Sequence, residues 1–177
     1  MKKFLVVIFL ILGGCLQAPQ NNFQMDEEIL SIPVQKIEIV SIAPHFHELP
    51  HIENQMPLSP EDALLQWGKK NLKAEKEIGS GLYFIIQQAE MVKVDKKNSS
   101  WFKLDEEIYT LIYSVELQFK NQEQLLKKIP VKGKGFVNIS KKANLAKKEK
   151  GWEWLIQKML AHIKTKLKDE ILSEQSN

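Results

Sequence analysis

The sequence predicts an α+β domain, in which two helices pack on a mostly antiparallel sheet of about four strands to form a two-layer sandwich. Three observations lead to this prediction. Residues 108–119 alternate between apolar and polar side chains, which is the period of a half-buried strand. Apolar residues recur at steps of three and four from 152 to 167, as in an amphipathic helix. Ser59 and Pro60, followed by two acids, mark the start of a second helix. The expected order of elements is β-α-β-β-β-α.

The first strand is expected over residues 33–42, which are rich in β-branched side chains. Several prolines follow within residues 43–60. Because each proline fixes φ and removes an N–H donor, this segment is predicted to be an extended strap. The helix that begins at Pro60 should end by Gly79-Ser80-Gly81. Its apolar side consists of Ala63, Leu64, Trp67 and Leu72.

Residues 82–94 predict a strand that is either buried on both faces at first or bulged near Gln87-Gln88, before a polar hairpin loop over 95–104. In the next strand one face consists of Tyr109, Leu111, Tyr113, Val115, Leu117 and Phe119. A third strand covers 131–139. Since Pro130 cannot donate to a ladder, the start of that strand should lie at an edge or outside the sheet. The last helix should run from about 145 to 174, with a stripe formed by Trp152, Leu155, Ile156, Met159, Ile163 and Leu167.

The amino terminus has the order of a secretory signal. Lys2 and Lys3 precede an apolar run over Phe4–Leu12, and small residues lead to Cys15. The run is shorter than the roughly 20 apolar residues that a membrane-spanning helix needs. Residues 1–14 are therefore interpreted as a signal peptide.

The residues before the cysteine make the signal more specific. Leu12-Gly13-Gly14-Cys15 is similar to the lipobox that lipoprotein signal peptidase cleaves, which implies a diacylglycerol on Cys15 as the new first residue. Two or three acyl chains hold a protein stably at a bilayer. The alternative is an ordinary secretory signal that contains a cysteine. Leu16, in place of an aspartate, favours the outer membrane in lipoproteins of the common Gram-negative type.

The remaining chain divides into a lipidated tether over 15–32 and a single α+β domain over 33–174, with a short helix near 25–30 as the alternative within the tether.

An apolar content of 44% is enough for a core. Cys15 is the only cysteine, so the domain must be stable without a disulfide. The formal charge of +3 falls when Lys2 and Lys3 leave with the signal. This balance gives no reason to expect nucleic acid as a partner.

The element order and several residues resemble a family of uncharacterised, periplasm-facing lipoproteins of alphaproteobacteria, over residues 34–170. The residues that carry the resemblance are Pro50, His51, Ile52, Glu53, Pro57, Pro60, Ala63, Trp67, Leu72 and Ala74, the strand from Gly81 to Val92 with Ala89, and Trp152. Asn54 stands where the family pattern has histidine, and the chain is unusually rich in lysine. More distantly, the order is similar to envelope lipoproteins that activate penicillin-binding proteins or assist ABC-type transport, which is an analogy of fold.

Three histidines, His45, His47 and His51, lie close together with Glu48 and Glu53. On an extended segment His45 and His47 would share a face, as two zinc ligands do. The other interpretation is a polar strap with exposed imidazoles, because a proline-rich strap gives no sign of the supporting shell that a metal site needs. No metal site and no cofactor are therefore predicted.

The region 127–150 is rich in lysine and is either a solvated face or a surface for anionic headgroups or an acidic partner. Trp67 and Trp152 fall on the apolar stripes and are expected in the core. Trp154 lies about 200° from Trp152 on a helical wheel, so it should face away from the sheet. Together with Trp101 and Phe102 in the predicted loop, Trp154 is the candidate partner contact, since buried tryptophans dominate interfaces.

We find no nucleophile motif, paired carboxylates, phosphate-binding loop or dinucleotide fingerprint in the sequence. The chain is therefore not expected to be an enzyme. The sequence favours a membrane-anchored envelope lipoprotein on the periplasmic side of the outer membrane, with a non-catalytic binding or assembly-accessory domain and an envelope protein as partner. The alternative is a carrier of lipid or another small apolar ligand between sheet and helices.

Overall fold

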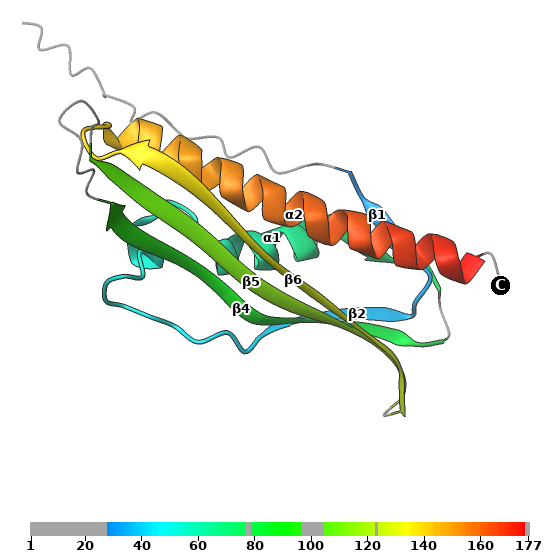
Figure 1. Cartoon of the computed structure of the whole chain (residues 1–177). Helices are drawn as coiled ribbons and strands as arrows, with labels where there is room; N and C mark the ends of the chain where they lie inside the picture. The colour runs from blue at the N-terminus through cyan, green and yellow to red at the C-terminus, as the bar shows by residue number, and fades with distance from the viewer. Residues whose placement is uncertain (1–27, 77–78, 97–104, 123, 176–177) are drawn as a thin grey trace, which may run out of the picture.

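The computed structural model describes residues 28–76, 79–96, 105–122 and 124–175 (Figure 1). Its elements, in chain order, are β1 (Leu30–Ile32), β2 (Lys36–Ser41), a short 3-10 helix η1 (Glu53–Gln55), α1 (Pro60–Asn71), β3 (Leu72–Ala74), β4 (Gly81–Lys96), β5 (Glu106–Asn121), β6 (Gln124–Ser140) and α2 (Leu145–Gln175).

The main sheet has four strands in the order β2-β4-β5-β6. β2 pairs parallel with β4, and the other two pairs are antiparallel. Both helices lie on the same side of this sheet (Figure 1). The predicted two-layer α+β sandwich is confirmed. A second, parallel sheet of β1 and β3 was not predicted.

β5 is the central strand of the core and confirms the predicted alternation. Its inner face is buried against the helices and consists of Tyr109, Leu111, Tyr113, Val115, Leu117 and Phe119. Each buried side chain of this size contributes roughly 1.5–3 kcal/mol relative to an exposed one. This row therefore determines which face of the sheet the helices cover.

α1 begins as predicted, and it ends before Leu72. The Asp62 N–H donates to Ser59 Oγ at 3.1 Å, and Pro60 occupies the first turn. The helix stops at Asn71, within the limit set by Gly79, but Leu72, which was expected on its apolar side, lies outside it. The placement of Leu72 in the helix was wrong because Leu72 to Ala74 pair with β1, and that pairing satisfies backbone groups that a longer helix would have used.

The first predicted strand, residues 33–42, is also corrected. The Val34 N–H donates to the Ile32 carbonyl at 2.7 Å in a turn, and β2 starts only at Lys36. Leu30–Ile32, which we expected in the tether, form β1. Just before it, Glu28 pairs with Lys164 and Lys168 of α2, each at 2.5 Å. The folded domain thus begins before residue 33.

Two irregular strand features were anticipated. The register of β4 against β5 shifts between Ile86 and Gln88, which confirms the bulge near Gln87-Gln88. Pro130 lies within β6, and β6 is an edge strand, as the missing N–H required. β6 is much longer than the predicted 131–139, because Gln122 takes a positive φ of 55° and turns the chain directly into a paired strand.

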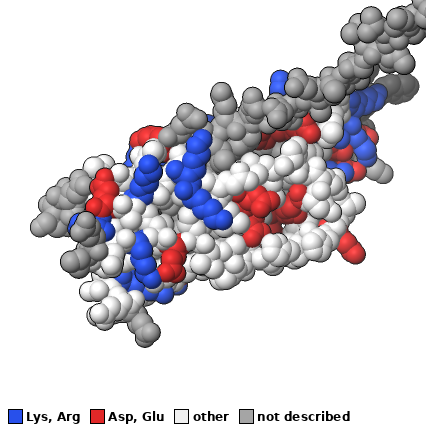
Figure 2. Space-filling model, turned by 180° about the vertical axis from the view of Figure 1, so that it is seen from behind, with Lys and Arg blue, Asp and Glu red and all other residues white. Residues whose placement is uncertain are grey.

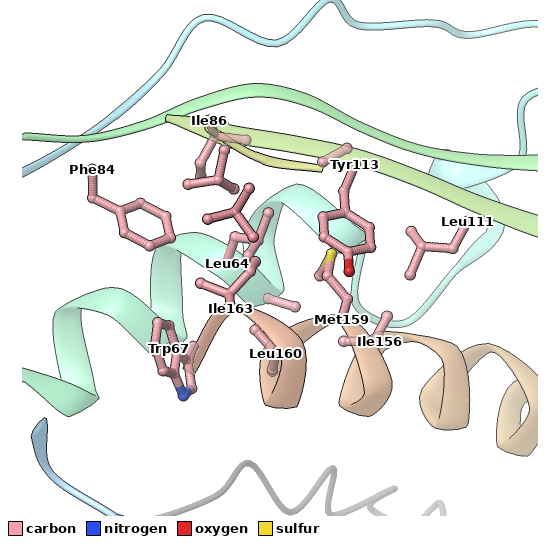
Figure 3. Packing of buried hydrophobic residues seen from close by; sticks show 14 of the residues in the cluster. Leu64, Trp67, Phe84, Ile86, Leu111, Tyr113, Ile156, Met159, Leu160 and Ile163 are labelled. Atoms are coloured by element: carbon pink, nitrogen blue, oxygen red, sulfur yellow. The ribbon is translucent and has the colours of Figure 1, made fainter. Parts of the chain in front are cut away.

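α2 confirms the predicted stripe and closes the core (Figure 3). The Trp152 ring packs edge-on against Tyr109, with centroids 5.5 Å apart. The Tyr113 hydroxyl reaches His162 Nδ1 on α2 at 2.6 Å. Glycine is required at 133, since a Cβ there would lie 2.2 Å from the Tyr113 oxygen. The Tyr113 side chain therefore occupies the space that a side chain at position 133 of β6 would fill.

Candidate binding surfaces

Three predicted site residues lie outside the described part of the chain. Cys15, the expected lipid-bearing residue, precedes residue 28, and Trp101 and Phe102 fall within 97–104. Within the described residues, no helix has the length and apolar content needed to cross a bilayer.

Trp154 occupies the solvent side of α2, as predicted. It is 48% exposed, whereas Trp152 is buried. The Lys158 ammonium lies 5.7 Å from the Trp154 ring centroid, one turn further along the helix. A cation over an exposed aromatic face contributes about 0.5–1 kcal/mol. Trp154 is thus an accessible, partly oriented aromatic side chain.

The proline-rich strap lies along the edge of β4 that β2 leaves unpaired. The Ile52 N–H donates to the Met91 carbonyl at 3.0 Å, and the Lys93 N–H donates to the Pro50 carbonyl at 2.8 Å. Ile52 is fully buried. The strap is therefore an integral part of the fold, which protects one end of the β4 edge.

Two of the three histidines of the strap line one cavity, and the third lies beside it. His45 and His47 line a cavity of about 250 Å³ with Glu53, Glu61 and Asp62, and His45 Nδ1 lies 3.3 Å from Glu61 Oε2. The His51 ring instead stacks on Phe46 at 4.0 Å. No group of three or more His, Cys, Asp or Glu among the described residues is arranged to hold a metal ion.

Glu53 has a structural role in the same region. Its Oε1 accepts the Met91 N–H at 2.6 Å, so the carboxylate ties η1 to the β4 edge. Glu61 and Asp62 lie in the first turn of α1, where acids interact favourably with the helix dipole. These bonds account for the carboxylates as parts of the strap and the helix terminus.

The outer face of the sheet, which neither helix covers, carries a buried carboxylate. Glu116 pairs with Lys128 at 2.7 Å and accepts the Gln87 amide at 2.9 Å. Gln118 also donates to it, and Ser114 donates to Gln87 at 3.0 Å. Lys128, and then Gln118, lower the pKa of the Glu116 carboxyl below its ordinary value. Sequence analysis missed this network, for which the only signal was the glutamine pair at the predicted bulge.

A second buried carboxylate joins α2 to the sheet. Lys148 contacts Glu107 at 2.6 Å, and the Tyr109 hydroxyl donates to Glu107 at 2.6 Å. Burial raises the pKa of Glu107, but Lys148 and Tyr109 lower it more, so that its pKa lies below the ordinary value of about 4.5. Burial, and then Glu107, raise the pKa of Tyr109.

The depressed pKa of Glu107 predicts a pH-dependent stability. A carboxylate of lowered pKa stabilises the fold above its unfolded-state pKa, and this contribution is lost as the pH falls through the folded-state pKa. Glu107→Gln should therefore lower the free energy of unfolding at pH 7 by about 1–3 kcal/mol. Urea unfolding at pH 7 and pH 3.5 should show this difference shrinking at the lower pH. A difference of equal size at both values would contradict the assigned charge.

The bulge in β4 shapes a shallow groove of about 620 Å³ across the outer face. It is lined by Pro44, Gln87, Gln88, Glu90, Ile112, Tyr113, Ser114, Lys132, Gly133 and Lys134. Gln88, Ser114 and Lys132 are direct cross-strand neighbours, and so are Glu90, Ile112 and Lys134. The groove thus follows two adjacent rows of side chains from the strap to the β6 edge.

Ion pairs divide the predicted basic region. Lys127 binds Glu170 at 2.5 Å, Lys141 binds Asp95 at 2.9 Å, and Lys128 and Lys148 have the carboxylates described above. On the face shown in Figure 2, lysines and acids are interspersed on the left, a group of acids lies right of the centre, and further lysines lie at the right-hand edge. Four lysines of the region therefore each have an acidic partner.

Comparisons with known proteins identify no family. No family model and no curated protein matches the chain. Among solved structures it is similar to a minor lipoprotein from Acinetobacter baumannii (12% identity, 81% of this chain and 95% of that chain, TM-score 0.39). It is also similar to rare lipoprotein B from Shewanella oneidensis (6% identity, 78% and 98%, TM-score 0.45). A third is an uncharacterized lipoprotein B from Nitrosomonas europaea (15% identity, 81% and 86%, TM-score 0.43). These three structures are of bacterial lipoproteins. The likeness assigns no function to this chain. Membership of the alphaproteobacterial family stays a prediction.

Proposed function

We propose that this protein is a lipid-anchored lipoprotein of the bacterial envelope, whose domain faces the periplasm from the outer membrane. Leu12-Gly13-Gly14-Cys15, placed after two lysines and a short apolar run, supports the anchor. Leu16 supports the outer membrane rather than the inner one. Acyl chains on Cys15 hold the domain near the bilayer, and the segment between Cys15 and Glu28 connects the two.

The anchored domain binds an envelope protein and performs no chemistry. The observation that carries this proposal is the outer face of the sheet, which the helices leave uncovered. Several apolar side chains are exposed on it, among them Phe136 at 65% and Val94 at 52%, with Val40 also exposed near the other end. Exposed apolar groups beside a polar groove are typical of a protein contact surface.

Packing between the layers favours this role over the alternative of a lipid carrier. Trp67, Leu64, Phe84, Ile86 and Ile163 are fully buried and fill the space between helices and sheet (Figure 3). A carrier would need a cavity there that is large enough for an acyl chain. The outer face, by contrast, is covered by neither helix among the described residues (Figure 1).

Site-specific photocrosslinking in cells tests the proposal. A benzophenone side chain at position 136 should give a discrete adduct with an envelope protein, because Phe136 is exposed on the outer face. Position 172, where Leu172 is similarly exposed on α2, is the matched control. An adduct at position 154 instead would move the contact to the solvent side of α2. The absence of any adduct from positions 136 and 154 would contradict the binding role.

A further inference from the structure

The edge of β6 is a long strand edge with no partner among the described residues. β6 pairs with β5 on one side, and no described strand pairs with it on the other. β4 has two partners on its other side, β2 and then the strap. An unpaired edge presents a row of N–H and C=O groups, which another extended chain can bind.

The direction of these backbone groups follows from two observations. Directly beyond β6, the Lys141 N–H donates to the Asp105 carbonyl at 2.9 Å, so the odd-numbered residues point toward β5. Pro130, which has no N–H, is even-numbered and lies in register with Glu116. Because backbone groups alternate along a strand, residues 132, 134, 136 and 138 direct their N–H and C=O groups to the open edge.

Side chains of the same residues make this edge positively charged and partly aromatic. Lys132, Lys134 and Phe136 project from the outer face in successive even positions and are exposed. Their neighbours on β5 are Ser114, Ile112 and Thr110, none of which is acidic. Lys128, two residues before Pro130, has Glu116 as its partner, whereas Lys132 and Lys134 have no ion pair with any described residue.

Building on the proposed function, we propose that the β6 edge binds an extended acidic segment of the partner protein as a fifth, antiparallel strand. Acidic side chains of that segment lie opposite Lys132 and Lys134, and an apolar side chain lies opposite Phe136. Direct cross-strand neighbours of opposite charge stabilise such a pair. A second copy of β6 is excluded as the occupant, because β6 contains lysines and no acid, so two copies would place like charges together.

Fluorescence anisotropy with a designed peptide tests this site on the full mature chain, purified in detergent from membranes. The probe is Thr-Val-Thr-Glu-Thr-Glu-Thr, which in antiparallel register places valine opposite Phe136 and the glutamates opposite Lys134 and Lys132. We expect binding that weakens about five-fold or more when both glutamates become glutamines. Lys132→Gln/Lys134→Gln should weaken binding similarly. The matched control Lys142→Gln/Lys150→Gln removes the same charge elsewhere and should leave affinity within two-fold.

N-methylated probes distinguish strand addition from simple charge attraction. Methyl groups on the valine and glutamate nitrogens, which face β6, should abolish binding, and methyl groups on the threonine nitrogens should not. Equal binding of the two methylated peptides would overturn the proposal, as would no binding of the parent peptide or an equal loss in the two lysine double variants.

The experiments distinguish a failure of the β6-edge proposal from a failure of the proposed binding role. If photocrosslinking from position 136 recovers the same envelope protein with the parent chain and with Lys132→Gln/Lys134→Gln, the binding role stands and the β6 edge is not its site. If the parent chain gives no adduct from positions 136 and 154, the binding role itself falls, whatever the peptide does.

Discussion

Replacing Trp67 by alanine should lower the free energy of unfolding by about 3–5 kcal/mol, the range for a fully buried large aromatic side chain. Trp67 is 0% exposed and lies where α1, α2 and the sheet meet (Figure 3). Its ring centroid is 6.2 Å from that of Phe84 on β4. The loss combines the transfer of apolar surface with a cavity that rigid neighbours on three elements cannot refill.

Urea unfolding followed by far-ultraviolet circular dichroism measures this effect. Trp154→Ala is the matched control, since it removes the same side chain type from a helix at an exposed position. Its effect should stay within about 1 kcal/mol, the range of the contact with Lys158. Similar losses in the two variants would contradict the assignment of Trp67 to the core and Trp154 to the surface.

Long elements could be predicted because their patterns are local. The alternation in β5 and the stripe of α2 each repeat over several periods, so every repeat adds to the same signal. Ser59 and Pro60 marked the start of α1 through chemistry within one turn. These three features already determine the layers and the face of the sheet that the helices cover.

Short parallel strands could not be predicted from sequence. β1 and β3 have three residues each, which is less than two periods of alternation, and Leu30 pairs with Leu72 far along the chain. That pairing ended α1 before Leu72 and brought residues 30–32 out of the tether. Contacts of this kind depend on where the rest of the chain places the two strands.

The same distinction between local patterns and long-range contacts holds for the candidate surfaces. The exposure of Trp154 followed from its angle on the helix. His45 and His47, which were expected on one face of an extended segment, line the same cavity. The partner of each lysine did not follow, because Lys128–Glu116 and Lys148–Glu107 depend on strand register and on helix placement. The difference between the paired lysines and Lys132 and Lys134 thus became visible only in the folded domain.

The lipid anchor carries the largest expected effect on function. If Cys15 bears the acyl chains, Cys15→Ser removes the only thiol to which they can be attached. The variant should lose all lipid label, since a hydroxyl does not replace the sulfur in that reaction. Gln17→Ser, a neighbouring substitution outside Leu12–Cys15, is the matched control and should keep the label.

The direct measurement is incorporation of radioactive palmitate in growing cells, followed by separation of membranes from soluble material. Our account predicts a labelled chain in the membrane fraction for the parent and for Gln17→Ser, and no label in Cys15→Ser. An unlabelled parent chain that fractionates with soluble proteins would contradict the anchor, and with it the place of the domain at the envelope membrane.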